Sequence, residues 1–255
     1  MTGADIIPPT AAWQSPPETL VLRTDEVHVW RATLDPAPSR GEIFWPTLAA
    51  DEKARADRFH FAKDRHHFIV ARGTLRAILG RYLNRVPECV PIAYGARGKP
   101  TLAGEVDRDA ICFNLSHSHG IALYAVARGR EIGIDIERIR SDVAVAEIAE
   151  RFFSRQEVAM LQGLSSDVQR EAFFRCWTRK EAYIKARGEG LSLPLDQFDV
   201  SLAPGEPAAL LGTRPEASEA SHWSLKNLDP FPGYAAALAV EGRGCSIACW
   251  QWQSV

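Results

Sequence analysis

Two carboxylates on one strand and a Glu–Lys pair on one helix are the residues of this chain whose types and spacing best suit phosphoryl chemistry. In Ile132–Glu137, alternation places Asp135 and Glu137 on one face of a strand and three isoleucines on the other. Glu181 and Lys185 lie four residues apart and share one face of a helix. Three carboxylates and a lysine suit a hard divalent cation and a phosphate ester.

Each of these pieces also has an ordinary interpretation. A carboxylate pair at a solvated strand end and an i,i+4 Glu–Lys pair are common on protein surfaces and contribute little stability there. We expect Asp135 to be an exposed strand-end carboxylate. The neighbouring motifs, taken in their order along the chain, favour the functional interpretation.

A row of cations precedes the carboxylates. Arg58, Arg65 and Arg72 recur every seven residues along a long helical segment, and Lys53 lies near its start. A charge row is ordinarily a solvated helix face. The functional alternative is an anion-binding wall, because guanidinium groups hold phosphate oxygens in bidentate pairs.

A glycine-containing turn, Arg97-Gly98-Lys99-Pro100, adds further candidates. The turn is not a Walker A loop, because it lacks that motif's spacing and its following Ser or Thr. Its glycine would let a ligand approach the backbone closely, with Lys99 placed against a phosphate.

Ser116 and His117 supply a hydroxyl and an imidazole at the end of an apolar strand. A Ser–His pair suggests hydrolase chemistry, but adjacent residues of a strand point to opposite faces. The chain also lacks the Gly-x-Ser-x-Gly elbow of a serine hydrolase at this point. We therefore expect His117 to contact a phosphate and do not expect Ser116 to be a nucleophile.

The elements that must position these candidates are predicted from apolar periodicity. The longest predicted helix, over residues 51–83, is expected to break near residues 59–63. Strands are predicted over residues 26–34, 92–94, 111–116, 121–127, 132–137, 198–202, 223–228, 234–240 and 246–252, and further helices over residues 143–149, 155–162 and 171–187.

An internal echo suggests two similar halves. Residues 68–73 (Phe-Ile-Val-Ala-Arg-Gly) match residues 183–188 (Tyr-Ile-Lys-Ala-Arg-Gly), so that on this offset each half has one long helix running into Ala-Arg-Gly. We predict an α+β fold of two similar halves, each a small, mostly antiparallel sheet packed with a long helix, with a cleft between them. The expected divisions are a loose N-terminal arm over residues 1–17, an N-terminal half over 18–129 and a C-terminal half over 130–255 that carries the metal site.

Composition limits the classes of partner. A formal charge of −2 over 255 residues gives no drive towards nucleic acid or anionic membranes, and no apolar run reaches the length of a membrane span. The N-terminal residues lack the pattern of a secretory signal. The five cysteines are scattered without zinc spacing, and Cys112 and Cys176 are expected to be buried hydrophobes. We expect a reduced, cytoplasmic protein.

The order of motifs resembles that of the 4′-phosphopantetheinyl transferases, the larger monomeric type that activates carrier proteins of non-ribosomal peptide and polyketide synthases. That family's fold is two pseudo-twofold-related α+β halves with coenzyme A and Mg²⁺ between them. The motifs are Gly-Lys-Pro at 98–100, Phe-Asn-Leu-Ser-His-Ser at 113–118, Gly-Ile-Asp-Ile-Glu at 133–137, Arg-Phe-Phe-Ser at 151–154, Trp-Thr-Arg-Lys-Glu-Ala at 177–182 and Gly-Leu-Ser-Leu-Pro at 190–194.

The resemblance implies roles for the site residues. Asp135, Glu137 and Glu181 would bind Mg²⁺, Glu181 would also be the base for the incoming serine, and Lys185 would contact the pyrophosphate. Ser116, His117 and Lys99 would line the nucleotide pocket, with His117 at the 3′-phosphate. The family's arginine on the first-half helix has no clean counterpart, so its role falls to Arg65, His67 or Arg72.

The predicted activity is Mg²⁺-dependent transfer of 4′-phosphopantetheine from coenzyme A to a serine of an acyl or peptidyl carrier protein, with release of adenosine 3′,5′-bisphosphate. The expected form is a monomer with a pseudo-dimeric fold. Two alternatives stay open: a metal-dependent phosphodiesterase that uses the same carboxylates to activate water, and a coenzyme A-binding module without turnover.

Overall fold

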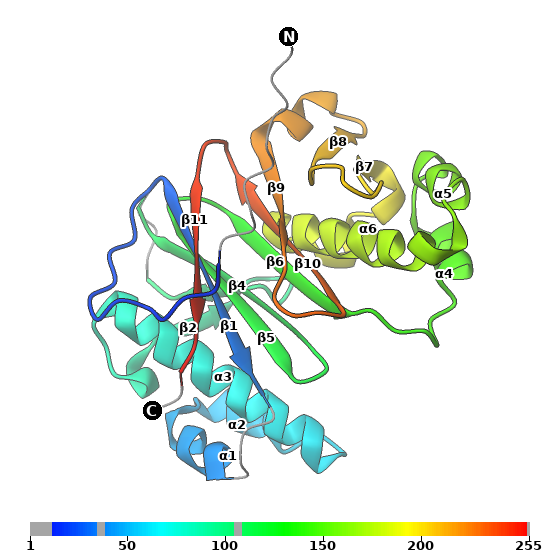
Figure 1. Ribbon diagram of the computed structural model, residues 1–255. Helices are drawn as coiled ribbons and strands as arrows, with labels where there is room; N and C mark the ends of the chain where they lie inside the picture. The colour runs from blue at the N-terminus through cyan, green and yellow to red at the C-terminus, as the bar shows by residue number, and fades with distance from the viewer. Residues whose placement is uncertain (1–11, 35–38, 105–108, 254–255) are drawn as a thin grey trace.

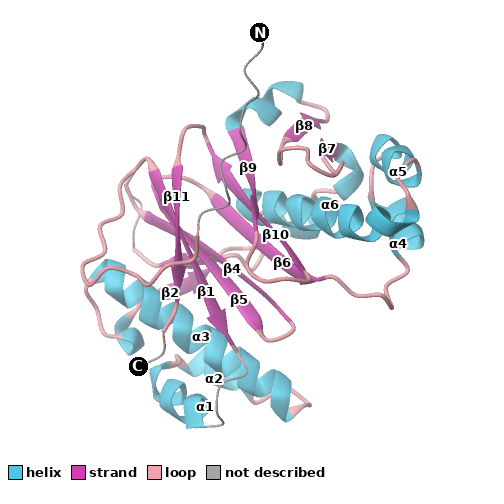
Figure 2. Ribbon diagram, in the orientation of Figure 1, coloured by secondary structure: helices cyan, strands magenta, loops and turns pink. Residues whose placement is uncertain are grey.

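The computed structural model describes residues 12–34, 39–104 and 109–253, and its fold is α+β, as the sequence predicts (Figure 1). Two antiparallel-rich sheets lie side by side, and a 22-residue helix packs against each of them (Figure 2). The prediction of a small sheet and a long helix in each half is confirmed.

The first sheet has the strand order β11-β1-β5-β4, with β1 and β11 parallel and the other neighbours antiparallel. Helix α3 (Ala62–Leu83) packs its apolar side chains against this sheet around Trp30 and Tyr124. The helix ends at Asn84, which has a left-handed φ of 50° and caps it. The strands are β1 (Glu26–Thr33), β4 (Ile111–Ser118), β5 (Ile121–Arg128) and β11 (Ser246–Gln251).

The second sheet has the order β6-β10-β9 and is antiparallel. Helix α6 (Ser166–Arg187) lies across β6 and β10. The helix comes so close to β6 that a Cβ at Gly133 would overlap the backbone of Ala182 and Ala186, which explains why this strand carries a glycine beside its carboxylates. The strands are β6 (Ile132–Arg138), β9 (Trp223–Leu228) and β10 (Tyr234–Glu241).

Shorter elements complete the two halves. The break expected near residues 59–63 is present, because α2 ends at Ala56 and α3 begins at Ala62. The shorter helices are α1 (Ser39–Phe44), α2 (Ala50–Ala56), α4 (Val145–Phe152) and α5 (Arg155–Gln162), with 3₁₀ turns η1 (Trp45–Thr47), η2 (Pro87–Cys89), η3 (Gly190–Ser192), η4 (Leu195–Gln197) and η5 (Ala217–His222). Two small hairpins pair β2 (Ile92–Tyr94) with β3 (Pro100–Leu102) and β7 (Phe198–Val200) with β8 (Leu210–Thr213).

A shared apolar core joins the halves. It contains Val27 and Val29 of the first sheet and the isoleucines at 132, 134 and 136 of β6, all of them fully buried. The alternation predicted for β6 is therefore correct, since its isoleucines enter this core while the opposite face meets α6. The two halves form one continuous structure and not two separate domains.

Three details of the structure differ from the predicted arrangement of a loose N-terminal arm and two similar halves that divide at residue 130. The last strand, β11, belongs to the first sheet, where it pairs with β1. Within the expected loose arm, residues 1–11 lie outside the described residues, but Trp13 donates a hydrogen bond to Asp229 and Gln14 bridges to Trp250. The Ala-Arg-Gly echo is also not a structural correspondence, because α3 continues through Gly73 whereas Gly188 ends α6.

None of the described helices is long and apolar enough to cross a membrane. Cys176 is fully buried, as expected, and Cys112 is partly buried. Burial raises the pKa of both thiols, which keeps them in their neutral, unreactive form.

Candidate active site

The carboxylate strand and the Glu–Lys helix meet at Asp135. The Nζ atom of Lys185 on α6 lies 2.6 Å from Asp135 Oδ1 on β6. The same ammonium donates to Ser116 Oγ on β4 at 3.0 Å, and Ser116 donates to Asp135 Oδ1 at 2.8 Å. Two sequence-predicted residues, one from each half of the molecule, therefore converge on one carboxylate oxygen of a third, Asp135.

Asp135 is buried, so the expectation of an exposed strand-end carboxylate is wrong. It lies in the middle of β6 with an exposed fraction of 3 %, because α6 covers this face of the strand. Its second oxygen, Oδ2, is buried without a hydrogen-bond partner. A buried, unpaired carboxylate oxygen costs free energy unless a cation or a donor approaches it.

Glu137 and Glu181 add negative charge beside Asp135. Burial, followed by the charge of Asp135, raises the pKa of Glu137. Burial also raises the pKa of Glu181 to about 7, with Asp135 and Glu137 adding to the rise and Lys185 opposing it. The three carboxylates are close enough to repel one another, which is the arrangement that a cation between them would relieve.

The donor types and the crowding of charge fit a hard divalent cation such as Mg²⁺, which prefers carboxylate oxygens. The orphaned Asp135 Oδ2 is the strongest single indication of a missing positive partner. Within the described parts of the chain, however, no three His, Cys, Asp or Glu side chains already stand close enough together to hold an ion. The carboxylates therefore supply the right ligands without a preformed ligand cage.

His117 on β4 is exposed to solvent and lies within electrostatic range of a group of cations. Desolvation lowers the pKa of this imidazole, and the positive charges of His67, Lys185, Arg55 and Arg72 lower it further. These groups come from α2, α3, β4 and α6, so tertiary structure gathers cations that are far apart in the sequence. Their mutual repulsion in the free protein makes this region a favourable place for a multiply charged anion.

Arg72 is the most constrained of these cations. Its side chain is 5 % exposed, its Nε lies 3.5 Å from Glu52 Oε1, and its Nη2 donates to the hydroxyl of Tyr94. Its Nη1 is buried without a hydrogen-bond partner. Arg76, one turn later, also pairs with Glu52, at 2.6 Å. Two buried arginines thus share one carboxylate, which leaves a net positive charge and a free donor.

The other predicted first-half cations have different surroundings. Arg65 pairs with Asp57 at 2.9 Å and lies over the ring of Trp45, 4.8 Å from its centroid. Lys53 also lies over this ring, at 5.8 Å. The Arg58 side chain is exposed to solvent.

The glycine-containing turn lies against the end of α6. Lys99 pairs with Glu131 at 2.6 Å and donates to the carbonyl of Ala186 at 2.7 Å. Arg97 lies 3.8 Å from a carboxylate oxygen of Glu189. Gly98 has a φ of +81°, which the turn requires, and Pro100 begins β3. The turn is therefore close to Lys185 along α6, but the Lys99 ammonium is already engaged.

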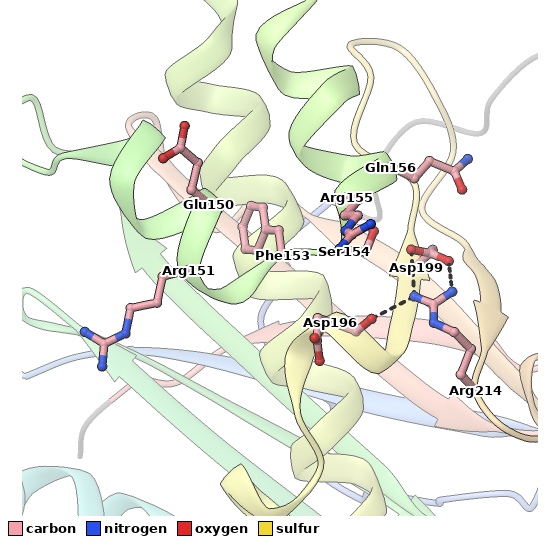
Figure 3. A pocket seen from close by; sticks show the side chains of 9 residues that line it. All are labelled: Glu150, Arg151, Phe153, Ser154, Arg155, Gln156, Asp196, Asp199 and Arg214. Atoms are coloured by element: carbon pink, nitrogen blue, oxygen red, sulfur yellow. Dashed lines mark hydrogen bonds and ion pairs between the residues drawn. The ribbon is translucent and has the colours of Figure 1, made fainter.

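A cavity of about 520 Å³ lies elsewhere, between α4, α5 and the segment around β7 (Figure 3). On one side of it Arg214 pairs with Asp199 at 2.6 Å. The predicted metal ligands and nucleotide-binding residues are absent from its lining, so it is separate from the candidate site. The lining residues are Glu150, Arg151, Phe153, Ser154, Arg155, Gln156, Asp196, Asp199 and Arg214.

Comparisons with known proteins agree with this arrangement of two halves. Residues 131–239 match the family model described as the 4′-phosphopantetheinyl transferase superfamily, and residues 33–128 match the one described as 4′-phosphopantetheinyl transferase, N-terminal. The 4′-phosphopantetheinyl transferase HetI of Nostoc sp. is 41 % identical over 240 residues, which cover 94 % of this chain and 98 % of HetI. The chain belongs to the 4′-phosphopantetheinyl transferase superfamily.

Further relatives place this transferase with the larger type of the family. The 4′-phosphopantetheinyl transferase Sfp of Bacillus subtilis is 29 % identical over 197 residues, which cover 77 % of this chain and 84 % of Sfp. The 4′-phosphopantetheinyl transferase AcpT of Escherichia coli is 44 % identical over 114 residues, which cover 44 % of this chain and 55 % of AcpT. The predicted membership and enzyme class are confirmed.

Sequence reasoning missed parts of the site in this transferase. The seven-residue count from Arg58 to Arg72 ran across the predicted break before α3, and the α2 cation whose charge acts on His117 is Arg55. The serine at 118, which donates to Glu137, was also overlooked. Its spacing of two from Ser116 was the available signal, since alternate residues share one face of a strand.

Proposed function

We propose that this transferase moves 4′-phosphopantetheine from coenzyme A to a serine of an acyl or peptidyl carrier protein and releases adenosine 3′,5′-bisphosphate. The observation that carries the proposal is the meeting of two charge clusters at β4. Ser116 lies with the carboxylates and Lys185, whereas His117, the next residue, lies with the cations of the first half. Coenzyme A has a phosphorylated nucleotide and a pyrophosphate, which need anion-binding groups at one end and a charge-stabilising group at the other.

The first-half cations would bind the nucleotide phosphate. Arg72 has a buried donor that is still free, and Glu52 and Tyr94 hold its guanidinium in place. Arg55, His67 and His117 add positive charge or donors beside it. Because these groups are positioned before the ligand arrives, little reorganisation is needed when it binds.

Lys185 and Glu181 would act at the reacting phosphorus. The serine oxygen of the carrier forms a bond to the phosphorus that bears pantetheine, and the bond from that phosphorus to the adenosine 5′-phosphate oxygen breaks. Lys185, held by Asp135 and Ser116, stabilises the charge that develops on the departing phosphate. Glu181, which lies beside Lys185 and the carboxylates of β6, would accept the proton of the serine hydroxyl.

Asp135, Glu137 and Glu181 are the residues that would hold Mg²⁺. When bound there, the ion would neutralise charge on the pyrophosphate oxygens. Both walls of the site come from a single chain, and for that reason we also propose that the enzyme acts as a monomer. The acidic wall belongs to β6 and α6, and the cationic wall to α2, α3 and β4.

The test is incubation of several apo carrier proteins with the full chain, coenzyme A and Mg²⁺, followed by intact-protein mass spectrometry. We expect one phosphopantetheine to be added to at least one carrier, and none to the same carrier with its acceptor serine replaced by alanine. Hydrolysis of coenzyme A in the absence of a carrier would identify a phosphodiesterase instead. Tight binding of coenzyme A without turnover on any carrier would identify a binding module.

A further inference from the structure

The two sheets meet at β4 and β6, each of which is an edge strand of its own sheet. The two strands lie next to each other at the centre of the molecule (Figure 1). Side chains of β4 at alternate positions, Asn114, Ser116 and Ser118, reach across to β6. Alternate residues share one face of a strand, so all three point to this junction.

Two of these side chains bind the backbone of β6. Asn114 Oδ1 accepts the N–H of Ile134 at 3.0 Å, and Ser118 Oγ accepts the N–H of Arg138 at 3.2 Å. Both side chains are buried, with exposed fractions of 4 % and 8 %. Buried backbone donors of an edge strand need such partners, and these bonds hold β6 in a fixed register against β4.

The two serines repeat one contact with two carboxylates. Ser116 donates to Asp135 at 2.8 Å, and Ser118 donates to Oε2 of Glu137 at 2.9 Å. In each pair β4 engages one carboxylate oxygen, and in Asp135 the other oxygen is buried without a partner. Hydrogen bonds that orient a ligand side chain in this way commonly decide how well a metal is bound.

We propose that Ser118 is a positioning residue that orients the Glu137 carboxylate for the divalent cation, so that the contact between the two sheets forms part of the metal site. The inference rests on the proposed function, because it concerns a carboxylate that we assign to Mg²⁺. The Ser118 hydroxyl has three partners. It donates to Glu137, its oxygen accepts the N–H of Arg138, and Nδ1 of His119 lies 3.2 Å from the same oxygen.

The experiment compares Ser118→Ala with Ser224→Ala in the full chain. Ser224 donates to the carbonyl of Gly242 at 2.6 Å and has no carboxylate hydrogen-bond partner among the described residues, so it controls for the loss of one serine hydrogen bond in the second half. Binding of Mn²⁺, used in place of Mg²⁺, is measured with saturating coenzyme A by electron paramagnetic resonance of the free ion. Thermal melting shows that each variant is folded.

We expect Ser118→Ala to weaken Mn²⁺ binding by about 10–100-fold, the usual effect of removing such a support, and Ser224→Ala to leave it unchanged. In transfer assays Ser118→Ala should raise the KM for Mg²⁺ and recover its kcat at saturating Mg²⁺. Wild-type affinity in Ser118→Ala, or equal losses in both variants, would overturn the inference alone. Failure of the wild-type chain to bind Mn²⁺ would instead overturn the metal assignment in the proposed function.

Discussion

The two long helices, α3 and α6, each have 22 residues. Each carries one charged side chain whose hydrogen-bonding groups are satisfied by partners in the protein and one whose groups are not. On α3, Arg76 is fully engaged by Glu52 and the carbonyls of Pro87 and Val90, while Arg72 keeps a buried donor without a partner. Arg76, whose partners are all within the protein, therefore stabilises the fold, whereas the unpaired donor of Arg72 is available to a ligand.

On α6 the same contrast, between a charged side chain with partners and one without them, holds between the adjacent residues Lys180 and Glu181. Lys180 is fully buried and is engaged by Glu157 and by the carbonyls of Leu195 and Phe198. Glu181, the next residue, has a pKa raised to about 7 by burial and neighbouring carboxylates. Burial alone therefore does not distinguish a structural charge from a functional one. The presence of a full set of partners does, because a buried charge without partners carries a cost that a ligand can remove.

The largest expected effect is at Asp135, the β6 carboxylate that pairs with Lys185 of α6. Asp135→Asn keeps the size of the side chain and removes its charge. We expect the rate of transfer to fall by at least about 10³-fold, roughly 4 kcal/mol of barrier, as measured by mass spectrometry of a carrier protein. The exposed Asp196→Asn is the control and should be unchanged. Near wild-type turnover of Asp135→Asn in Mg²⁺ would refute the metal assignment.

On α3 the engaged charge should matter for folding. Arg76→Met leaves Glu52 with one fewer partner in a buried site, and we expect the free energy of unfolding to fall by about 3–5 kcal/mol in urea titrations. Coenzyme A affinity of the folded protein, measured at low temperature, should change little. A large loss of affinity with unchanged stability would show that Arg76 is a ligand contact and would remove the contrast with Arg72.

Arg72 on α3 should show the opposite pattern to Arg76, a loss of ligand affinity with little change in stability. Arg72→Met should weaken coenzyme A by about 1.5–3 kcal/mol, the contribution of one charged hydrogen bond. Dephospho-coenzyme A, which lacks the 3′-phosphate, should be affected much less. Titration calorimetry of both ligands separates the cases: equal losses would place Arg72 at the pyrophosphate, and no loss for either would show that its free donor serves no ligand.

The pKa of Glu181 predicts a pH-dependent effect on stability. A carboxyl whose folded-state pKa is raised stabilises the fold below its unfolded value of 4.5, and this contribution is lost as the pH rises through about 7. In metal-free buffer Glu181→Gln should therefore be more stable than the wild type above pH 7, by about 2 kcal/mol after allowance for partial exposure. The advantage should vanish below pH 4.5. Unfolding titrations across this range that show a constant difference would contradict the raised pKa.

The smallest effect is expected at a surface cation of α3. Arg65 pairs with Asp57, and both side chains are substantially exposed to solvent. Arg65→Ala should change stability by less than about 1 kcal/mol, and we expect no selective loss for coenzyme A over its dephospho form. A loss as large as that of Arg72→Met, measured by the same calorimetry, would extend the anion-binding surface to the start of α3.

Local periodicity in the sequence predicted the long helices and most strands, although it missed α1, β3 and β8, and it put the acidic candidates on shared faces. Alternation assigned the isoleucines of β6 to the core and its carboxylates to the other face, and the structure agrees. The helical spacing of Glu181 and Lys185 put them on one face of α6, opposite those carboxylates. Such patterns are reliable because alternate residues of a strand, and residues four apart in a helix, share a face whatever the rest of the chain does.

The remaining features depend on contacts between distant segments, which no local pattern encodes. The position of β11 in the first sheet and the burial of Asp135 under α6 arise from packing across more than one element. The same is true of the cations: Glu52 on α2 engages Arg76 and restrains Arg72, while Arg65 remains at the surface. The sequence by itself determined the family and the strand and helix faces on which the acidic candidates lie. Only the tertiary structure decided which of these cations find partners, because Glu52 on α2 reaches Arg72 and Arg76 on α3 only when folding brings the two helices together.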